Sequence, residues 1–424
     1  MMPLFSTLPK AANITWQYAP RALRLHPRHP HRAIEREPVA HPGALWYTSG
    51  LMINPRPLVT FLLCLLGIYL MWNIPTLAPP VRARNKAWPR ISVIVPARNE
   101  EQRIRPLLDS LVQQTRPPHE IIVIDDHSSD DTAGIAKRMG ATVIHGHALP
   151  VGWTGKSWAC WQGAQHASGE LLLFLDADAW LETDGIERIV HSHENKGGLV
   201  TVQPYHVTRR PYEELSAFFN VVLMAGMNTF TPHGDSLEPS GSFGPCVVCS
   251  RDDYFGVGGH QRVKEDVLES IPMARLFLSH TLPVSCYGGR GAISFRMYPG
   301  GIAQLVEGWS KGVISGALSI KRSVLLAIVA WITGCFASIV DLVQSLALPL
   351  TPAALLPVMV YCLYALQIRW MLARIGSFRR WTAVLFPIPL FFFAFIMLRS
   401  LVVVRLLGRV TWRGRDIAAH CDEQ

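Results

Sequence analysis

Apolar and polar positions divide the chain into a central region of short alternating patterns and two flanking apolar stretches. Between residues 90 and 300, short apolar runs alternate with segments whose apolar residues recur every three or four positions. Short apolar runs are typical of strands buried on both faces. Apolar residues at every third or fourth position are typical of the helices that cover such strands. We expect strands at Ile91–Val95, Ile121–Ile124, Ala141–Ile144 and Leu171–Leu175, and helices at Glu101–Gln114 and Thr132–Met139. This order predicts an α/β fold with a mostly parallel sheet.

The flanking stretches have the length and composition of membrane helices. Leu58–Pro80 carries no charge, which predicts a first span. After residue 322 we expect further spans at Ser323–Val340, within Leu342–Ile368 (divided by Pro349, Pro352 and Pro357) and at Thr382–Leu398. Gly301–Lys321 mixes charged and apolar residues, which predicts a segment along the membrane surface.

Composition agrees with a soluble domain combined with several membrane spans. The 424 residues are 49% hydrophobic with a mean hydropathy of +0.21, too apolar for an ordinary soluble protein. The net charge is +9, and residues 1–56 contribute seven Lys or Arg against two Asp or Glu. Basic residues beside apolar spans mark cytoplasmic-facing segments, and no alternation of aromatic and basic residues indicates nucleic-acid binding. The single CxxC, Cys246–Cys249, lacks the further ligands that zinc needs, and the scattered cysteines fit a reducing compartment.

These patterns predict six regions along the chain. Residues 1–56, with eight prolines, form a disordered basic extension, and residues 57–80 form a transmembrane helix. An α/β domain at 88–300 is followed by an interfacial segment at 301–322, transmembrane helices within 323–408 and a tail at 409–424.

The segment LLLFLDAD, from Leu171 to Asp178, is the strongest chemical signal in the chain. Its apolar half reads as a buried strand, so Asp176 and Asp178 fall at the carboxyl end, where open α/β sheets bind ligands. Two hard oxygen ligands there suit Mg²⁺ or Mn²⁺, which bridge diphosphates. The alternative is a surface loop with two solvated acids.

Other strand ends add polar groups at the same edge. The first strand ends in PARNEE (Pro96–Glu101) and the second in DDHSSDDT (Asp125–Thr132). Carboxylates in the second loop can accept hydrogen bonds from a uracil N–H or from ribose hydroxyls, or the loop can simply cap the next helix. Lys156, in GWTGKSWA, can place a cation near a phosphate or remain solvated, and its surroundings lack the spacing of an ATPase P-loop.

In this order, PARNEE, DDHSSDDT, the Gly-Lys pair and LDADA resemble the family 2 glycosyltransferases, which have the GT-A (Rossmann-like) fold. Later segments resemble the membrane enzymes of this family that act on carotenoid acids. These segments are QPYH (203–206), FGP (243–245), GGH (258–260), FRMYPGG (295–301), EGWSKG (307–312) and WRGR (412–415). The resemblance covers residues 58–418.

The resemblance implies a role for each matching position. It implies nucleotide-sugar binding by Pro96, Arg98, Glu100, Asp125, Asp126, Gly155, Lys156 and Asp176, and metal binding by Asp176 and Asp178. The family's Glu-Asp base reads Glu269–Ser270 here, so Glu269 is favoured as the base over Asp266 in the upstream acidic pair.

The family's processive synthases carry a QxxRW motif, for which this chain has EGWSKG. Trp309 and Lys311 are therefore candidates for acceptor stacking and diphosphate contact. Arg296 is a candidate for phosphate contact, with a structural salt bridge as its alternative, and for Trp309 the alternative is an interfacial anchor.

The resulting expectation is a multi-pass enzyme of the cell membrane with its catalytic domain facing the cytoplasm. It transfers a sugar, with UDP-glucose as the expected donor, to a lipophilic acceptor from the bilayer, with a carotenoid acid as the expected acceptor. One alternative is transfer to another membrane lipid, such as diacylglycerol, a polyprenyl phosphate or a hopanoid. The non-enzyme alternative is a nucleotide-sensing membrane scaffold.

Overall fold

The structure is a computed structural model that describes residues 55–79, 87–266, 268–347, 352–407, 409–412 and 415–418. Almost all of the predicted disordered extension at 1–56, and much of the tail at 409–424, lie outside these residues.

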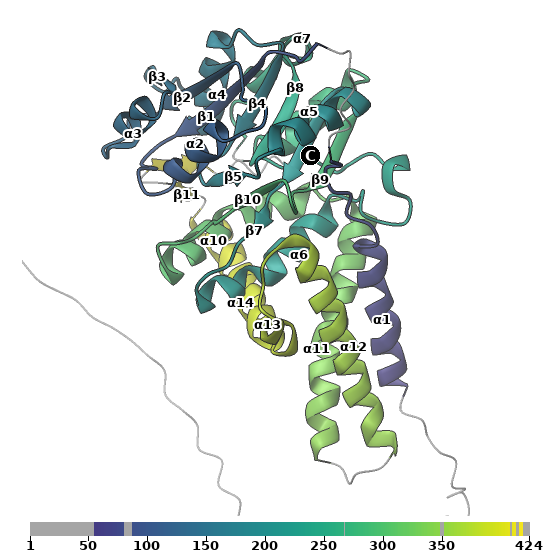
Figure 1. Ribbon diagram of the computed structural model, residues 1–424. Helices are drawn as coiled ribbons and strands as arrows, with labels where there is room; N and C mark the ends of the chain where they lie inside the picture. Colours follow the sequence, from purple (N-terminus) through teal and green to yellow (C-terminus); the bar gives the residue numbers. More distant parts are fainter. Residues whose placement is uncertain are drawn as a thin grey trace, which may run out of the picture. The chain divides into compact units, whose positions relative to one another are not determined.

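A seven-stranded sheet forms the centre of the α/β region, in the order β3-β2-β1-β4-β8-β6-β9 (Figure 1). The first four strands in this order are parallel, as predicted, whereas β8 is antiparallel to both β4 and β6, so the sheet is mixed. The strands are β1 (Ile91–Ala97), β2 (Glu120–Asp125), β3 (Thr142–His145), β4 (Leu171–Leu175), β6 (Leu199–Gln203), β8 (Cys246–Ser250) and β9 (Val284–Gly288).

Helices cover both faces of this sheet (Figure 1). Successive side chains of β1 point to opposite faces, so that Val93 and Val95 join one core and Ile94 joins the other. The first core includes α2 (Ile104–Val112), α3 (Thr132–Arg138) and α5 (Gly185–Lys196). The second is covered by α4 (Gly155–His166), α7 (Arg251–Gly256), α8 (Gly259–Arg262) and α9 (Ser270–Ser279). Burial on both faces explains the nearly continuous apolar runs in the sequence.

A small sheet in the order β5-β10-β7 lies between the large sheet and the C-terminal helices (Figure 1). Its strands are β5 (Ala179–Leu181), β7 (Tyr205–His206) and β10 (Ile293–Phe295). β5 follows β4 after the two predicted metal-binding aspartates, so these acids lie where the two sheets meet.

Two helices in the described part of the chain are long and apolar enough to cross a membrane, at Arg322–Leu346 and Ala354–Ile375. They belong to α11 (Arg322–Leu346) and α12 (Pro352–Ile375). α11 continues through Asp341, and Pro357 lies inside α12 instead of ending it. The predicted first span is shorter than expected, because α1 (Arg56–Leu70) ends ten residues before Pro80. Its 15 residues extend about 22 Å, less than the roughly 30 Å of a hydrocarbon core.

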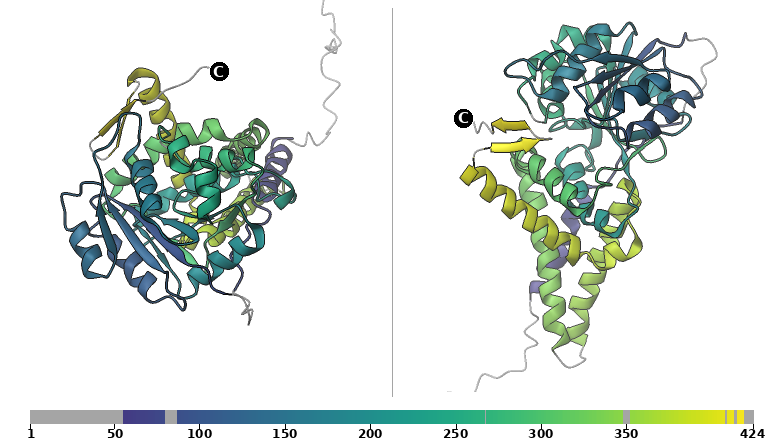
Figure 2. Two further views of the ribbon diagram at one scale, coloured as in Figure 1. Left: turned by 90° about the horizontal axis from the view of Figure 1, so that it is seen from above. Right: turned by 90° about the vertical axis from the view of Figure 1, so that its left-hand side faces the viewer.

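α1, α11 and α12 lie side by side (Figures 1 and 2) and share polar contacts. The Tyr364 hydroxyl donates to the Thr60 carbonyl at 2.9 Å, and Thr60 Oγ1 donates to buried Asp341 at 3.1 Å. Asp341 also pairs with Arg56 at 3.3 Å. A Cβ at Gly334 would collide with the Tyr364 hydroxyl, so glycine allows these helices to approach closely. The outward residues of these helices, including Leu62, Leu326 and Leu366, are exposed and apolar.

The remaining helices join this group to the α/β region. The single helix α10 (Ile302–Ser319) fills the predicted interfacial segment and packs against α14 (Pro387–Leu407). The predicted span at Thr382–Leu398 is divided between α13 (Arg380–Val384) and α14. The apolar part of α14, Pro387–Val402, has 16 residues and is shorter than α11 and α12. α14 crosses the α11–α12 pair obliquely (Figure 2). The turns η1 (Pro211–Ser216) and η2 (Gly234–Ser236), α6 (Ala217–Gly226) and the hairpin β11–β12 (Arg409–Trp412, Arg415–Ala418) complete the described fold.

Candidate active site

The two predicted metal-binding acids follow β4 directly. The Asp176 amide donates to the Pro245 carbonyl at 2.9 Å, and the Ala179 amide closes a turn on Asp176 at 3.1 Å. This turn places Asp176 and Asp178 on the wall of one cleft. Burial, and then the neighbouring Asp176, raises the pKa of Asp178 to about 7. The pair is therefore a place where negative charge is costly and a cation would be stabilised.

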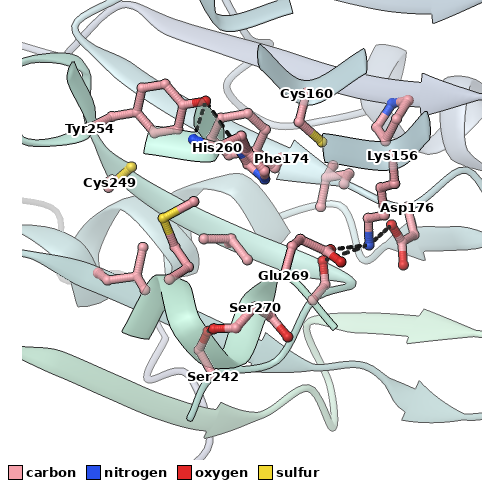
Figure 3. A pocket seen from close by; sticks show the side chains of 16 residues that line it. Lys156, Cys160, Phe174, Asp176, Ser242, Cys249, Tyr254, His260, Glu269 and Ser270 are labelled. Atoms are coloured by element: carbon pink, nitrogen blue, oxygen red, sulfur yellow. Dashed lines mark hydrogen bonds and ion pairs between the residues drawn. The ribbon is translucent and has the colours of Figure 1, made fainter. Parts of the chain in front are cut away.

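Lys156 connects Asp176 to the favoured base (Figure 3). Its Nζ lies 2.8 Å from Asp176 Oδ1 and 3.0 Å from Glu269 Oε1. Burial alone would lower the pKa of Lys156, but Asp176 and Glu269 offset this and hold it well above its usual value. A side chain at position 244 would contact both Lys156 and Glu269, so Gly244 leaves room for this cluster. No local pattern predicts the contact between Lys156 and Glu269, which are 113 positions apart.

Thr154 and the start of α4 hold Lys156 in place. Thr154 caps the helix, since its side chain accepts a hydrogen bond from the Ser157 amide at 3.4 Å. Its own amide donates to the Lys264 carbonyl at 2.8 Å, which ties the Gly-Lys turn to the loop before Glu269.

A cleft of about 200 Å³ collects most of the predicted nucleotide-binding residues. The residues of the prediction that line it are Pro96, Arg98, Glu100, Asp126, Gly155, Lys156, Asp176 and Asp178. Arg98 donates to the Asp126 carbonyl at 3.0 Å, and Arg103 pairs with Glu100 at 2.7 Å. The first two strand-end loops and the aspartate pair thus form one concave surface.

Asp125 does not line that cleft. Its carboxylate accepts from the Ser128 amide at 3.3 Å and lies 3.3 Å from His145 Nδ1. Asp126 lies 3.3 Å from His127 Nδ1. Asp125 therefore organises the turn beside the cleft, whereas the N-cap of the following helix α3 is Asp131, without a side-chain hydrogen bond.

A metal ion fits the donor set at this site. Within the described ranges, His, Cys, Asp and Glu form no group of three or more that could hold a metal. Asp176 and Asp178 supply two hard oxygen donors, and Mg²⁺ is commonly held by one or two carboxylates together with substrate phosphates. The chemistry of the two acids, and the raised pKa of Asp178, fit this mode of binding.

The two candidate bases lie in different surroundings. Glu269 is 7% exposed, is the N-cap of α9 and contacts Lys156, whereas the Asp266 side chain is exposed. Burial, then the neighbouring Glu265 and Glu269, raise the pKa of Asp266.

The three residues proposed to contact acceptor or diphosphate have other partners where they are described. Arg296 donates from Nε and Nη2 to Glu213 at 3.0 and 2.6 Å, the salt bridge that was its alternative. Trp309 is buried, stacks on Phe219 with ring centroids 4.6 Å apart and donates to Ser216 at 3.0 Å, so it is a core residue and not an exposed anchor. Lys311 lies in α10, and its side chain is outside the described atoms.

A second, smaller cavity of about 20 Å³ is lined by Lys156 and Glu269, among other residues (Figure 3). His260, from the GGH segment, lines it together with Tyr254, whose hydroxyl is 2.9 Å from His260 Nδ1. Burial lowers the pKa of His260 to about 3, so the ring is neutral at pH 7. The ring also packs against Phe174 of β4, with centroids 5.1 Å apart.

Comparison with known proteins identifies the class to which this fold and cleft belong. Residues 92–254 match the family described as "Glycosyl transferase family 2". The 4,4'-diaponeurosporenoate glycosyltransferase of Staphylococcus aureus is 37% identical over 330 residues, which cover 77% of this chain and 88% of the relative. The chain therefore belongs to glycosyltransferase family 2 and is a glycosyltransferase.

Two of the solved structures that match this chain contain Mn²⁺. The mannosyltransferase PcManGT from Pyrobaculum calidifontis, in complex with GDP-Man and Mn²⁺, has 18% identity and a TM-score of 0.47, covering 82% of this chain and 94% of its own. Glucosyl-3-phosphoglycerate synthase from Mycobacterium tuberculosis, with Mn²⁺, UDP and glucosyl-3-phosphoglycerate, has 21% identity and a TM-score of 0.36, covering 61% and 88%.

Proposed function

We propose that this enzyme transfers a sugar, with UDP-glucose as the donor, to the carboxylate of a carotenoid acid at the membrane. The observation that carries the proposal is the cleft in which Asp176, Asp178 and Lys156 meet the first two strand-end loops. The relative that shares 37% identity is named for transfer to such an acid, which supports the acceptor class.

In this proposal, Asp176 and Asp178 hold Mg²⁺ or Mn²⁺. When bound, the ion neutralises charge on the departing nucleoside diphosphate. Arg98 and Asp126 form the wall beside the nucleotide, and Lys156 supplies a fixed positive charge next to Asp176. These groups orient the donor so that its anomeric carbon faces the acceptor.

Glu269 is the better placed candidate base, because it lies in the Lys156 cluster while Asp266 faces solvent. A carboxylic acid acceptor is already ionised near pH 7, however, and needs no strong base. We therefore expect Glu269→Gln to retain transfer to a carboxylate acceptor and to lose transfer to a hydroxyl acceptor. Asp266→Asn is the matched control, and complete loss of transfer to the carboxylate in Glu269→Gln would contradict this mechanism.

We propose a multi-pass membrane location with the catalytic domain facing the cytoplasm. α11 runs away from the α/β region and α12 returns towards it (Figure 1). Basic residues cluster at the returning end: Arg374 donates to the Met71 carbonyl at 2.6 Å, and Arg379 follows in the next turn. By the positive-inside tendency this end is cytoplasmic. The basic hairpin β11–β12 contacts α10 and α14, which supports placing the C-terminus on the same side.

The decisive experiment incubates membranes containing the protein with labelled UDP-glucose and identifies the labelled lipid by thin-layer chromatography and mass spectrometry. Label in a carotenoid ester supports the proposal. Label in diacylglycerol, a polyprenyl phosphate or a hopanoid would replace the acceptor, and donor binding without any labelled lipid would indicate the scaffold. Asp178→Ala is the negative control, since it removes one of the two proposed metal ligands.

A further inference from the structure

Two adjacent buried glutamates in η1 accept hydrogen bonds from different parts of the chain. Glu213 is 2% and Glu214 is 3% exposed, so each carboxylate needs partners to offset the loss of hydration. Glu213 accepts two hydrogen bonds from Arg296 of the segment after β10, at 3.0 and 2.6 Å. Glu214 accepts from the Arg379 amide at 3.1 Å and from Thr382 Oγ1 at 2.6 Å, both at the start of α13.

A continuous row of paired backbone residues runs from the strand that follows Asp178 to the turn that follows α12. Phe295 in β10 pairs with Ala179 on one side and with His206 on the other, and His206 bridges Gly376. We call these four residues the bridging row. One end adjoins Asp178, whose carbonyl accepts from the Arg296 amide at 3.4 Å. The other end is the turn that follows the membrane helix α12.

Side chains hold the middle of the bridging row in one arrangement. The His206 ring packs between Phe295 and Phe378, with centroids 5.1 and 5.5 Å away. Asn220 donates to His206 Nδ1 at 3.0 Å, and Ser377 donates its amide to the His206 carbonyl at 2.8 Å. A short strand buried in this way transmits displacement, because close-packed groups cannot shift independently.

We propose that the bridging row positions the aspartate pair relative to the membrane helices, and that Glu213 and Glu214 are the positioning residues at its two ends. The position of a membrane-derived acceptor along the membrane normal is set by α11 and α12, whereas the donor is held by loops of the large sheet. The bridging row connects Asp178 to the turn after α12, so it sets the distance between the two substrates.

The test substitutes Thr382, close to the end of the bridging row that follows α12. It measures hydrogen exchange at the other end, around Asp176 and Asp178. Thr382→Val removes the hydroxyl donor to Glu214 with little change in shape, and Thr382→Ser keeps it. Hydrogen–deuterium exchange of the detergent-purified full chain is followed at residues 376–384, 293–298 and 176–181. For Thr382→Val we expect exchange about tenfold faster in all three segments, the change made by losing one hydrogen bond to a charged group. Thr382→Ser should match the wild type.

The remaining segments show whether the effect follows the bridging row. Exchange at β2 and β3 should stay unchanged, because these strands lie at the opposite edge of the large sheet. Acceleration confined to 376–384 would overturn the proposal, and so would uniform acceleration that includes β2 and β3. Glu214→Gln provides a second variant, and Glu170→Gln, in a solvent-exposed ion pair with Arg90, is the matched control.

Kinetics provide a separate readout that rests on the proposed sugar transfer. The nucleotide-binding loops lie outside the bridging row, so calorimetric UDP binding without metal should be unchanged in Thr382→Val. The kcat should fall about tenfold, as is typical when support around metal ligands is lost. Unchanged kcat despite faster exchange at 176–181 would overturn the positioning role. Failure to detect sugar transfer even in the wild type would instead count against the proposed function, and the exchange result would still stand.

Discussion

Lys156 offers the sharpest test of the active-site geometry. Its Nζ lies 2.8 Å from Asp176 and 3.0 Å from Glu269, so these two carboxylates face each other across one ammonium group. Replacing Lys156 by Met keeps the length of the side chain and removes its charge. The two carboxylates would then be within about 6 Å of each other, where they repel by about 3 kcal/mol at an effective dielectric constant of about 20.

The predicted cost follows from the burial of the cluster. Removing one partner of a buried ion pair costs about 3–5 kcal/mol, but the Lys156 side chain is 24% exposed. We therefore expect a loss of about 2–3 kcal/mol in the free energy of unfolding. For a domain of this size the melting temperature falls by about 5–10 °C. Thermal unfolding of the detergent-purified protein in EDTA measures this fall in melting temperature.

Two further measurements separate charge from packing. Combining Lys156→Met with Glu269→Gln removes the repulsion and should recover about half of the loss, whereas the two changes would add if they acted independently. Mn²⁺ should stabilise Lys156→Met more than the wild type, because a cation at Asp176 replaces the missing ammonium. Wild-type melting of Lys156→Met in EDTA, or a double variant no more stable than the single one, would refute the electrostatic account of the cluster.

Three other predictions concern the support of the site. Trp309→Phe removes the N–H donated to Ser216 and should cost about 1 kcal/mol of unfolding free energy, with the acceptor KM unchanged if the indole only packs; a large rise in that KM would restore an acceptor role. Gly334→Ala puts a methyl group against the Tyr364 hydroxyl and should destabilise the helix group by about 1–3 kcal/mol in thermal unfolding. Burial lowers the pKa of His206 to about 4, so between that value and its usual 6.5 the unfolded chain binds a proton that the folded chain does not. Lowering the pH from 7 to 5 should therefore cost about 2 kcal/mol through this residue, and His206→Gln should lose less stability over the same range.

The sequence predicted the structure best where an apolar pattern comes from a single helix or strand. β4 was predicted with its observed bounds, because five apolar residues end abruptly in Asp176. The small sheet was missed, since strands of two or three residues show no period that distinguishes them from a loop.

Local sequence patterns also did not predict which side chains from distant segments contact each other. Arg296 looks like a phosphate ligand until the fold brings Glu213 beside it, and Trp309 looks like an interfacial residue until Phe219 covers it. The bounds of the apolar helices differ from the predicted ones for a similar reason. Asp341 interrupts an apolar run in the sequence, but in the structure Arg56 and Thr60 stabilise it inside α11.

The contact between Asp341 and α1 has a consequence for biosynthesis. Thr60 leaves the ribosome 281 residues before the carboxylate that it contacts, so nearly the whole catalytic domain is synthesised between the two partners. A charged side chain in the bilayer is costly until it is paired. In the membrane location proposed above, stable integration of α11 therefore requires α1 to be present first. We expect deletion of α1 to block assembly at a late stage of translation, after the sugar-transfer domain has been made.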